Sequence, residues 1–360
     1  MADFDYGNTR LRAMKSRLIP RRALEGLTEV GSVQGLINAL TDTAYRDAVE
    51  AALVRAVGME CLAEALRNDL VATVGKARRF FRDQAGDLAA LVLRRYDLHN
   101  VKTVLRGLVR QVPASEILAS TLPIGELRPV DLSELARSQN FRAAIDLLAT
   151  WAAPLSQPLL ELRARRRGEG VEVSELELAL DRWHVHTAMQ AAREADEEGR
   201  TLFEALRLEA DVTNIMTALR LGSVADAALT LRERFGADDL TALFVDPGHV
   251  RFGLLTEAVR KSSVGEAVSV LVGTPYGPIL ASAMQGYSAT GRLSIFERAL
   301  ARRQLRHAAG LCARDPLGIG VLVGYVALKT NEVANLRAIA QGLMLGEKPE
   351  RIRAELMFVD

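Results

Sequence analysis

The stretch YDLHNVKTVLRG, residues 96–107, places an aspartate, a histidine and an asparagine within four positions. Side chains of these types can take part in acid–base catalysis when they lie within hydrogen-bond reach of a substrate. One interpretation of Asp97, His99 and Asn100 is therefore an active site. The other is a polar contact that holds the fold together.

The acid and the asparagine of this stretch recur twice further along the chain, again three positions apart. The three pairs are Asp97 with Asn100, Asp211 with Asn214, and Glu332 with Asn335. The histidine does not recur, because the equivalent positions hold threonine and alanine. An enzyme gathers different groups at one place, whereas this chain repeats the same two groups at intervals of about a third of its length. We therefore predict that the pairs brace the fold, with each asparagine tying two helices by hydrogen bonds; direct contact to a partner is the alternative.

A second element recurs ahead of each pair and in the same order. Residues 32–40, 140–148 and 263–271 each begin with serine or asparagine and end on leucine, and a threonine and an aromatic residue follow. Polar residues before an apolar helical pattern are typical of helix N-caps. The two repeated elements predict an internal triplication, with helical lobes at residues 1–128, 129–250 and 251–360.

Composition and patterning indicate an all-α protein. Apolar residues recur with the helical period over most of the 360 residues, and alternating strand patterns are scarce. The formal net charge of +1 argues against binding to nucleic acid or an anionic membrane by bulk electrostatics. No apolar run has the length and composition of a membrane span or secretory signal, so a cytoplasmic protein is expected.

Motifs for chemistry are missing from the sequence. It contains no phosphate loop of the GxxxxGK type, no nucleophile elbow and no HExxH, and His184 and His186 lack further ligands at metal-binding spacing. We therefore expect no catalytic residue, no cofactor and no metal site.

Four segments, in order along the chain, carry a resemblance to a known family. They are YGNTRLRAMKSRL (6–18), TDTAYRDAV (41–49), YDLHNVKTVLRG (96–107) and the C-terminal NEVANLRAIAQGLMLGEKPERIRAELMFVD (331–360). Together with the triplication, they resemble the C subunit of V-type and A-type ATP synthases, which is related to the d subunit of the eukaryotic V-ATPase.

This resemblance implies three similar helical lobes arranged as a funnel around a pseudo-threefold axis. It also implies a non-catalytic rotor adaptor in the central stalk, between the membrane proteolipid ring and the shaft built from the D and F subunits. Such an adaptor transmits torque for ATP-coupled proton or sodium transport, and it meets the membrane only through its protein partners. By position within the resemblance, Arg10, Arg12 and Lys15 are candidates for an exposed partner-contact face. A helical interaction scaffold unrelated to ATP synthase is the alternative.

Overall fold

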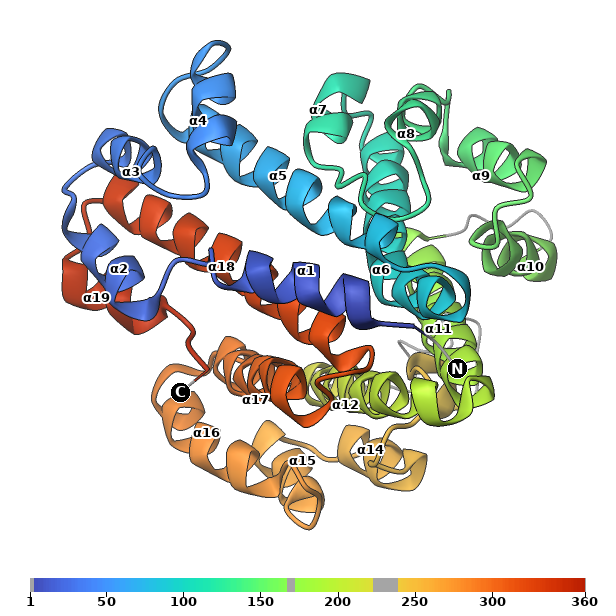
Figure 1. Ribbon diagram of the computed structural model, residues 1–360. Coiled ribbons are helices and arrows are strands. Elements are labelled where there is room, and N and C mark those ends of the chain that lie inside the picture. Colours follow the sequence, from blue (N-terminus) through green and yellow to red (C-terminus); the bar gives the residue numbers. More distant parts are fainter. Residues whose placement is uncertain (1–2, 167–171, 223–238, 360) are drawn as a thin grey trace. The chain divides into compact units, whose positions relative to one another are not determined.

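The computed structural model describes residues 3–166, 172–222 and 239–359, and every regular element in these ranges is a helix (Figure 1). The all-α prediction is therefore confirmed. The chain forms two compact units. The first comprises Met1–Asp97, Ala119–Pro129 and Leu305–Asp360, and the second comprises Leu98–Leu118 and Val130–Gln304. This division into two units does not test the three predicted lobes.

The first unit draws its helices from both ends of the chain. They are α1 (Asp5–Lys15), α2 (Arg21–Gly26), η1 (Leu27–Glu29), α3 (Val33–Leu40), α4 (Arg46–Leu53), α5 (Gly58–Ala77), η2 (Arg78–Phe80), α18 (Gly320–Met344) and α19 (Pro349–Glu355). The helix α18 packs against α1, α3, α5 and α19. Much of its surface is buried on several sides. Its first ten residues, GVLVGYVALK, are apolar almost all round, as expected of a central helix.

The second unit contains the middle of the chain. Its helices are α7 (Ala114–Ala119), α8 (Pro129–Ala136), α9 (Phe141–Thr150), α10 (Ser156–Arg166), α11 (Val173–Glu194), α12 (Asp196–Leu221), η3 (Leu240–Leu243), α14 (Phe252–Val259), α15 (Val264–Leu271) and α16 (Gly277–Thr290). Two further helices, α6 (Asp83–Val109) and α17 (Ser294–Arg314), begin in one unit and end in the other.

A continuous apolar core fills part of the second unit. It joins α12 to α14, α15 and α16 through side chains that are fully buried, among them Ile215, Leu255, Leu271 and Leu280. Within each helix the buried residues recur at helical spacing in the sequence, so the apolar pattern accounts for the burial of one helix face. The core fixes the position of α12, which carries one of the acid–asparagine pairs.

The three predicted N-caps are confirmed. The side chains of Ser32, Asn140 and Ser263 each accept a hydrogen bond from the backbone N–H three residues later, at 3.0, 3.0 and 3.2 Å. Each cap satisfies a helix-start donor that would otherwise lack a partner inside the helix. The helices α3, α9 and α15 therefore begin at equivalent places in the three repeated elements.

Each repeated element has a threonine at or just after the end of its helix, and in two copies this threonine makes the same hydrogen bond. Thr43 and Thr274 donate to the carbonyl oxygen three residues earlier, at 2.7 and 2.6 Å. Thr150 instead donates to Asp146, four residues earlier, because α9 continues through it. The middle copy differs here, where its sequence is one residue short between the threonine and the aromatic residue.

The helices of the described ranges fall short of a membrane span. None of them combines the length and the hydropathy needed to cross a bilayer.

Candidate functional site

The three acid–asparagine pairs lie on three long helices, α6, α12 and α18, and all six side chains are at most 4% exposed. Buried carboxyl and amide groups are costly unless they are hydrogen-bonded, so their partners decide what they can do.

Asn214 and Asn335 make the same pair of hydrogen bonds with the backbone. Asn214 donates to the carbonyl oxygen of Val245 at 3.1 Å and accepts from its N–H at 3.0 Å. Asn335 does the same with Met357, at 2.9 Å for both bonds. Each amide side chain thus satisfies both backbone groups of one residue in an extended segment. These asparagines join a helix to a loop, and not two helices as the sequence had led us to expect. Asn100 is fully buried on α6.

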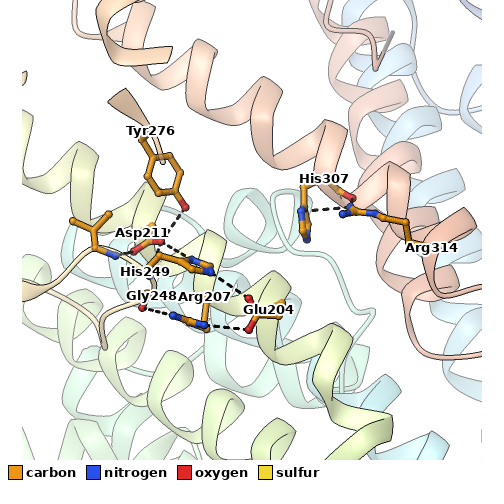
Figure 2. A network of polar contacts seen from close by, with 9 residues as sticks. Glu204, Arg207, Asp211, Gly248, His249, Tyr276, His307 and Arg314 are labelled. Atoms are coloured by element: carbon orange, nitrogen blue, oxygen red, sulfur yellow. Dashed lines mark hydrogen bonds and ion pairs between the residues drawn. The ribbon is translucent and has the colours of Figure 1, made fainter. Parts of the chain in front are cut away.

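Asp211 accepts hydrogen bonds from two different segments of the second unit (Figure 2). The backbone N–H groups of His249 and Val250 donate to its two oxygens at 2.8 and 3.0 Å, and the Tyr276 hydroxyl donates at 2.9 Å. Burial, together with the Asp211 charge, raises the pKa of Tyr276, so the hydroxyl stays protonated and remains a donor. Asp211 therefore joins α12 to the loop before α14 and to the turn before α16.

His249 extends this network in a way that the sequence did not predict. Its Nδ1 lies 3.1 Å from Asp211 Oδ2, and its Nε2 lies 3.2 Å from Glu204 Oε2. Arg207 bonds to the other oxygen of Glu204 and to the carbonyl oxygen of Gly248, both at 3.1 Å (Figure 2). No short motif could have indicated the contact of His249 with Glu204, because the two residues are 45 positions apart.

Asp97 accepts from a loop of the first unit in the same manner. The N–H groups of Glu126 and Leu127 donate to its two oxygens at 2.7 and 2.9 Å. Burial raises the pKa of the Asp97 carboxyl, against the opposing effect of these two hydrogen bonds. Gly125 directly precedes the two residues that donate to Asp97. In the same way, Gly248 directly precedes the two residues that donate to Asp211. A Cβ at either glycine would collide with the carboxylate, so both loops need glycine there.

Glu332, the acid of the third pair, sits in a buried charge cluster. It accepts from the Ile19 N–H and, at 2.7 Å, from the Tyr45 hydroxyl. Lys329, one turn earlier on α18, lies 2.8 Å from Glu332 and 2.7 Å from Asp69. Lys329 and Asp69 were missed at the sequence level. The spacing of Lys329 and Glu332, three apart on one helix, was the available signal.

The two tyrosines of the repeated element contact the acid of a different repeat. Tyr276, in predicted lobe 251–360, donates to Asp211, and Tyr45, in predicted lobe 1–128, donates to Glu332. In both cases the tyrosine follows a repeated helix, and the acid comes from another copy of the repeat. The tyrosine of the third copy contacts the acid of the second, and the tyrosine of the first copy contacts the acid of the third. The three-lobe division itself stays a prediction.

The three cationic residues of α1 are exposed, but two of them have intramolecular contacts. Arg12 donates to the carbonyl oxygen of Pro316, in the loop before α18. The Arg10 guanidinium lies 5.8 and 5.7 Å from the ring centroids of Tyr6 and Phe80, within the range of cation–π attraction. Lys15 forms no ion pair with a carboxylate in the described ranges.

The neighbouring histidines of α11 lie in different surroundings. His186 pairs with Asp246 at 2.8 Å, and His184 is buried. Among residues 3–166, 172–222 and 239–359, no group of three or more His, Cys, Asp or Glu side chains is arranged to hold a metal ion.

Replacing Asn214 with alanine is expected to lower the free energy of unfolding by about 2–3 kcal/mol, because both backbone groups of Val245 lose their partner in a buried place. Asn335→Ala should cost less, because the Met357 carbonyl oxygen keeps its bond from Asn331 and the site is only partly buried. Asn100→Ala is predicted to cost a few kcal/mol at most. Chemical denaturation followed by circular dichroism measures these changes. Thr213→Ala is the matched control, since Thr213 is exposed and its hydroxyl bonds to the preceding turn of its own helix. If the variants keep their stability but no longer assemble with partner proteins, the asparagines contact a partner and do not brace the fold.

Comparison with known proteins assigns the chain to a family. Residues 7–355 match the family described as ATP synthase (C/AC39) subunit. The A-type ATP synthase C subunit of Methanosarcina barkeri is 26% identical over 359 residues, which cover 99% of this chain and 94% of that protein. The proteins of the same name from Halobacterium salinarum and Haloferax volcanii are each 28% identical, with 99% of this chain and 98% and 97% of theirs covered. The chain therefore belongs to the ATP synthase (C/AC39) subunit family.

Proposed function

We propose that the chain is a non-catalytic rotor adaptor in the central stalk of a V/A-type ATP synthase. It links the shaft of the D and F subunits to the membrane proteolipid ring and passes torque between them. The observation that carries this proposal is the match to proteins named as the C subunit of A-type ATP synthases, along almost the whole of both chains. The same match speaks against the alternative of a scaffold unrelated to ATP synthase.

The polar contacts of the long helices support a mechanical role. An adaptor that transmits torque must resist twisting, and close-packed helices tied to their loops by buried hydrogen bonds form a stiff body. Asp211 and Asn214 tie α12 to the loop before α14 and to the turn before α16. Glu332 and Asn335 tie α18 to the segment after α1 and to the segment after α19.

The same contacts support a non-catalytic chain. The acids of the three pairs, together with Asn214 and Asn335, direct their hydrogen-bonding groups at the chain's own backbone, at tyrosines and at Lys329. A general base needs a free lone pair aimed at a substrate. Bracing is therefore the role that these side chains fit best.

The proposed arrangement is three similar lobes, at residues 1–128, 129–250 and 251–360, that form a funnel about a pseudo-threefold axis. Support comes from the equivalent N-caps of α3, α9 and α15 and from the repeated carboxylate and amide contacts. By analogy with the family, a body with three similar lobes suits partners that have rotational symmetry. The chain would lie at the cytoplasmic side of the membrane, held there by protein partners.

Purification from native membranes tests the adaptor role. A tagged chain is expected to co-purify with the proteolipid and with the D and F subunits, and to stay on the membranes through mild low-salt washing. Mass spectrometry of the purified complex identifies the partners. Release of the chain by mild washing, without any ATPase subunit, would contradict the proposal, and turnover in a broad hydrolase screen would contradict its non-catalytic part.

A further inference from the structure

A pocket of about 590 Å³ opens in the first unit beside the Glu332 cluster. Its walls come from the end of α1, from α2, from the last part of α17, from α18 and from the segment that follows α19. The volume lies within the range of pockets that hold small ligands or the side chains of a partner. Neither the family match nor the bracing contacts assigns an occupant to it.

The rim of this pocket is positively charged. Lys15 and Arg306 line it, both are exposed, and neither forms an ion pair with a carboxylate in the described ranges. Arg21 also lines it, but its charge is matched by Glu25 at 2.8 Å, and its guanidinium lies 4.7 Å from the ring centroid of Phe358. The carboxylate at the wall, Glu332, already faces the Lys329 ammonium. Unmatched cations beside a pocket favour an anionic occupant.

The interior of the pocket is largely apolar, with one polar wall. Leu24, Leu328 and Phe358 contribute hydrocarbon surface. Asn331 forms part of the wall; its Nδ2 donates to Met357, while its Oδ1 is buried and has no hydrogen-bond partner among the described residues. An occupant with an apolar body and an N–H group close to this wall would satisfy both features.

We propose that this pocket binds a peptide segment of a protein partner in which a carboxylate stands beside an apolar side chain. The carboxylate meets Lys15 and Arg306, and the apolar side chain packs on Leu24 and Leu328. A peptide fits better than a lipid because its backbone supplies N–H donors for the polar wall. The inference deepens the proposed function, and it rests on that function for the assumption that the partner is a protein.

The test uses the full-length purified chain and two tripeptides, acetyl-Asp-Leu-Phe-amide and its neutral counterpart acetyl-Asn-Leu-Phe-amide. Titration is followed by the NMR signals of the Gly310 backbone amide and the Asn331 side-chain amide. The acidic peptide is expected to bind about fivefold more tightly than the neutral one, the scale set by two partly exposed charge contacts. The double variant Lys15→Ser/Arg306→Ser should abolish this preference.

The charge-matched control is Arg17→Ser/Arg337→Ser, which removes two exposed cations that do not line the pocket. It should keep the preference for the acidic peptide. Equal binding of both peptides, absence of saturable shifts, or the same loss in the control variant would overturn the inference. So would vesicles of dioleoylphosphatidylglycerol that bind in a Lys15- and Arg306-dependent manner and displace the peptide, since the occupant would then be a lipid. Each of these results leaves the membrane co-purification outcome unaffected, so the two proposals fail separately.

Discussion

Replacing Lys329 with methionine is expected to lower the free energy of unfolding by about 3–5 kcal/mol near neutral pH. Lys329 is 3% exposed, and its ammonium is the shared partner of Asp69 and Glu332. It also donates to the Tyr45 hydroxyl at 2.9 Å. Methionine retains much of the side-chain volume but leaves two carboxylates buried without a counter-charge, which is the costly part of breaking a buried ion pair.

The loss of stability in Lys329→Met should shrink as the pH falls. Burial raises the pKa of the Asp69 carboxyl, and Lys329 opposes that rise, so removing the ammonium raises this pKa further. A carboxyl with a raised pKa in the folded state takes up a proton before the unfolded chain does. The penalty is then full above the raised pKa and is relieved as the pH falls through it.

Urea denaturation of the wild type and Lys329→Met, at about pH 7.5 and about pH 5, measures both effects. Lys261→Met is the control, because Lys261 pairs with Glu257 at the protein surface and should cost at most about 1 kcal/mol. Adding Asp69→Asn and Glu332→Gln to Lys329→Met is expected to restore part of the stability. A loss below about 1 kcal/mol at neutral pH would show that the cluster does not depend on the buried ammonium.

Replacing Asp211 with alanine is expected to lower the free energy of unfolding by about 3–5 kcal/mol. The variant leaves three donors without an acceptor: the N–H groups of His249 and Val250 and the hydroxyl of Tyr276. Each unsatisfied buried donor costs about 1–3 kcal/mol, less where water can enter. Because Asp211 ties the loop before α14 and the turn before α16 to α12, its loss should also loosen that loop.

A double-mutant cycle with Tyr276→Phe isolates one of these contacts. Asp211→Ala and Tyr276→Phe remove the two ends of the same hydrogen bond, so the double variant should lose less stability than the sum of the single changes. Chemical denaturation gives the free energies, and hydrogen exchange of the Val250 amide reports on the loop. Asp246→Ala is the control, since the Asp246 side chain is 42% exposed and pairs with His186 at the surface. Strict additivity would mean that the Tyr276 contact contributes nothing.

The acid–asparagine pairs show how far local pattern could predict the braces. Their spacing and recurrence predicted that the pairs brace the fold, and all six side chains are buried. Their partners could not be predicted, because the donors lie in loops that have no periodic pattern. For Glu332 the Tyr45 hydroxyl is 287 positions away in the chain.

The cationic face of α1 illustrates the same limit. Their position within the family resemblance predicted an exposed face for Arg10, Arg12 and Lys15, and all three are exposed. Only the folded chain shows that Arg12 contacts the loop before α18 and that Lys15 lines a pocket with Arg306. Arg306 is remote in sequence, so no motif joins it to Lys15.

The sequence by itself determined the helices, their caps and the recurrence of an acid and an asparagine in three equivalent places. These depend on contacts within a few residues, where helical periodicity and capping preferences act directly. Tertiary structure decided which backbone groups the acids and asparagines satisfy, and it brought Asp69, Lys329 and Glu332 into one buried cluster. Those contacts join distant segments, and packing of whole helices brings them within hydrogen-bond range.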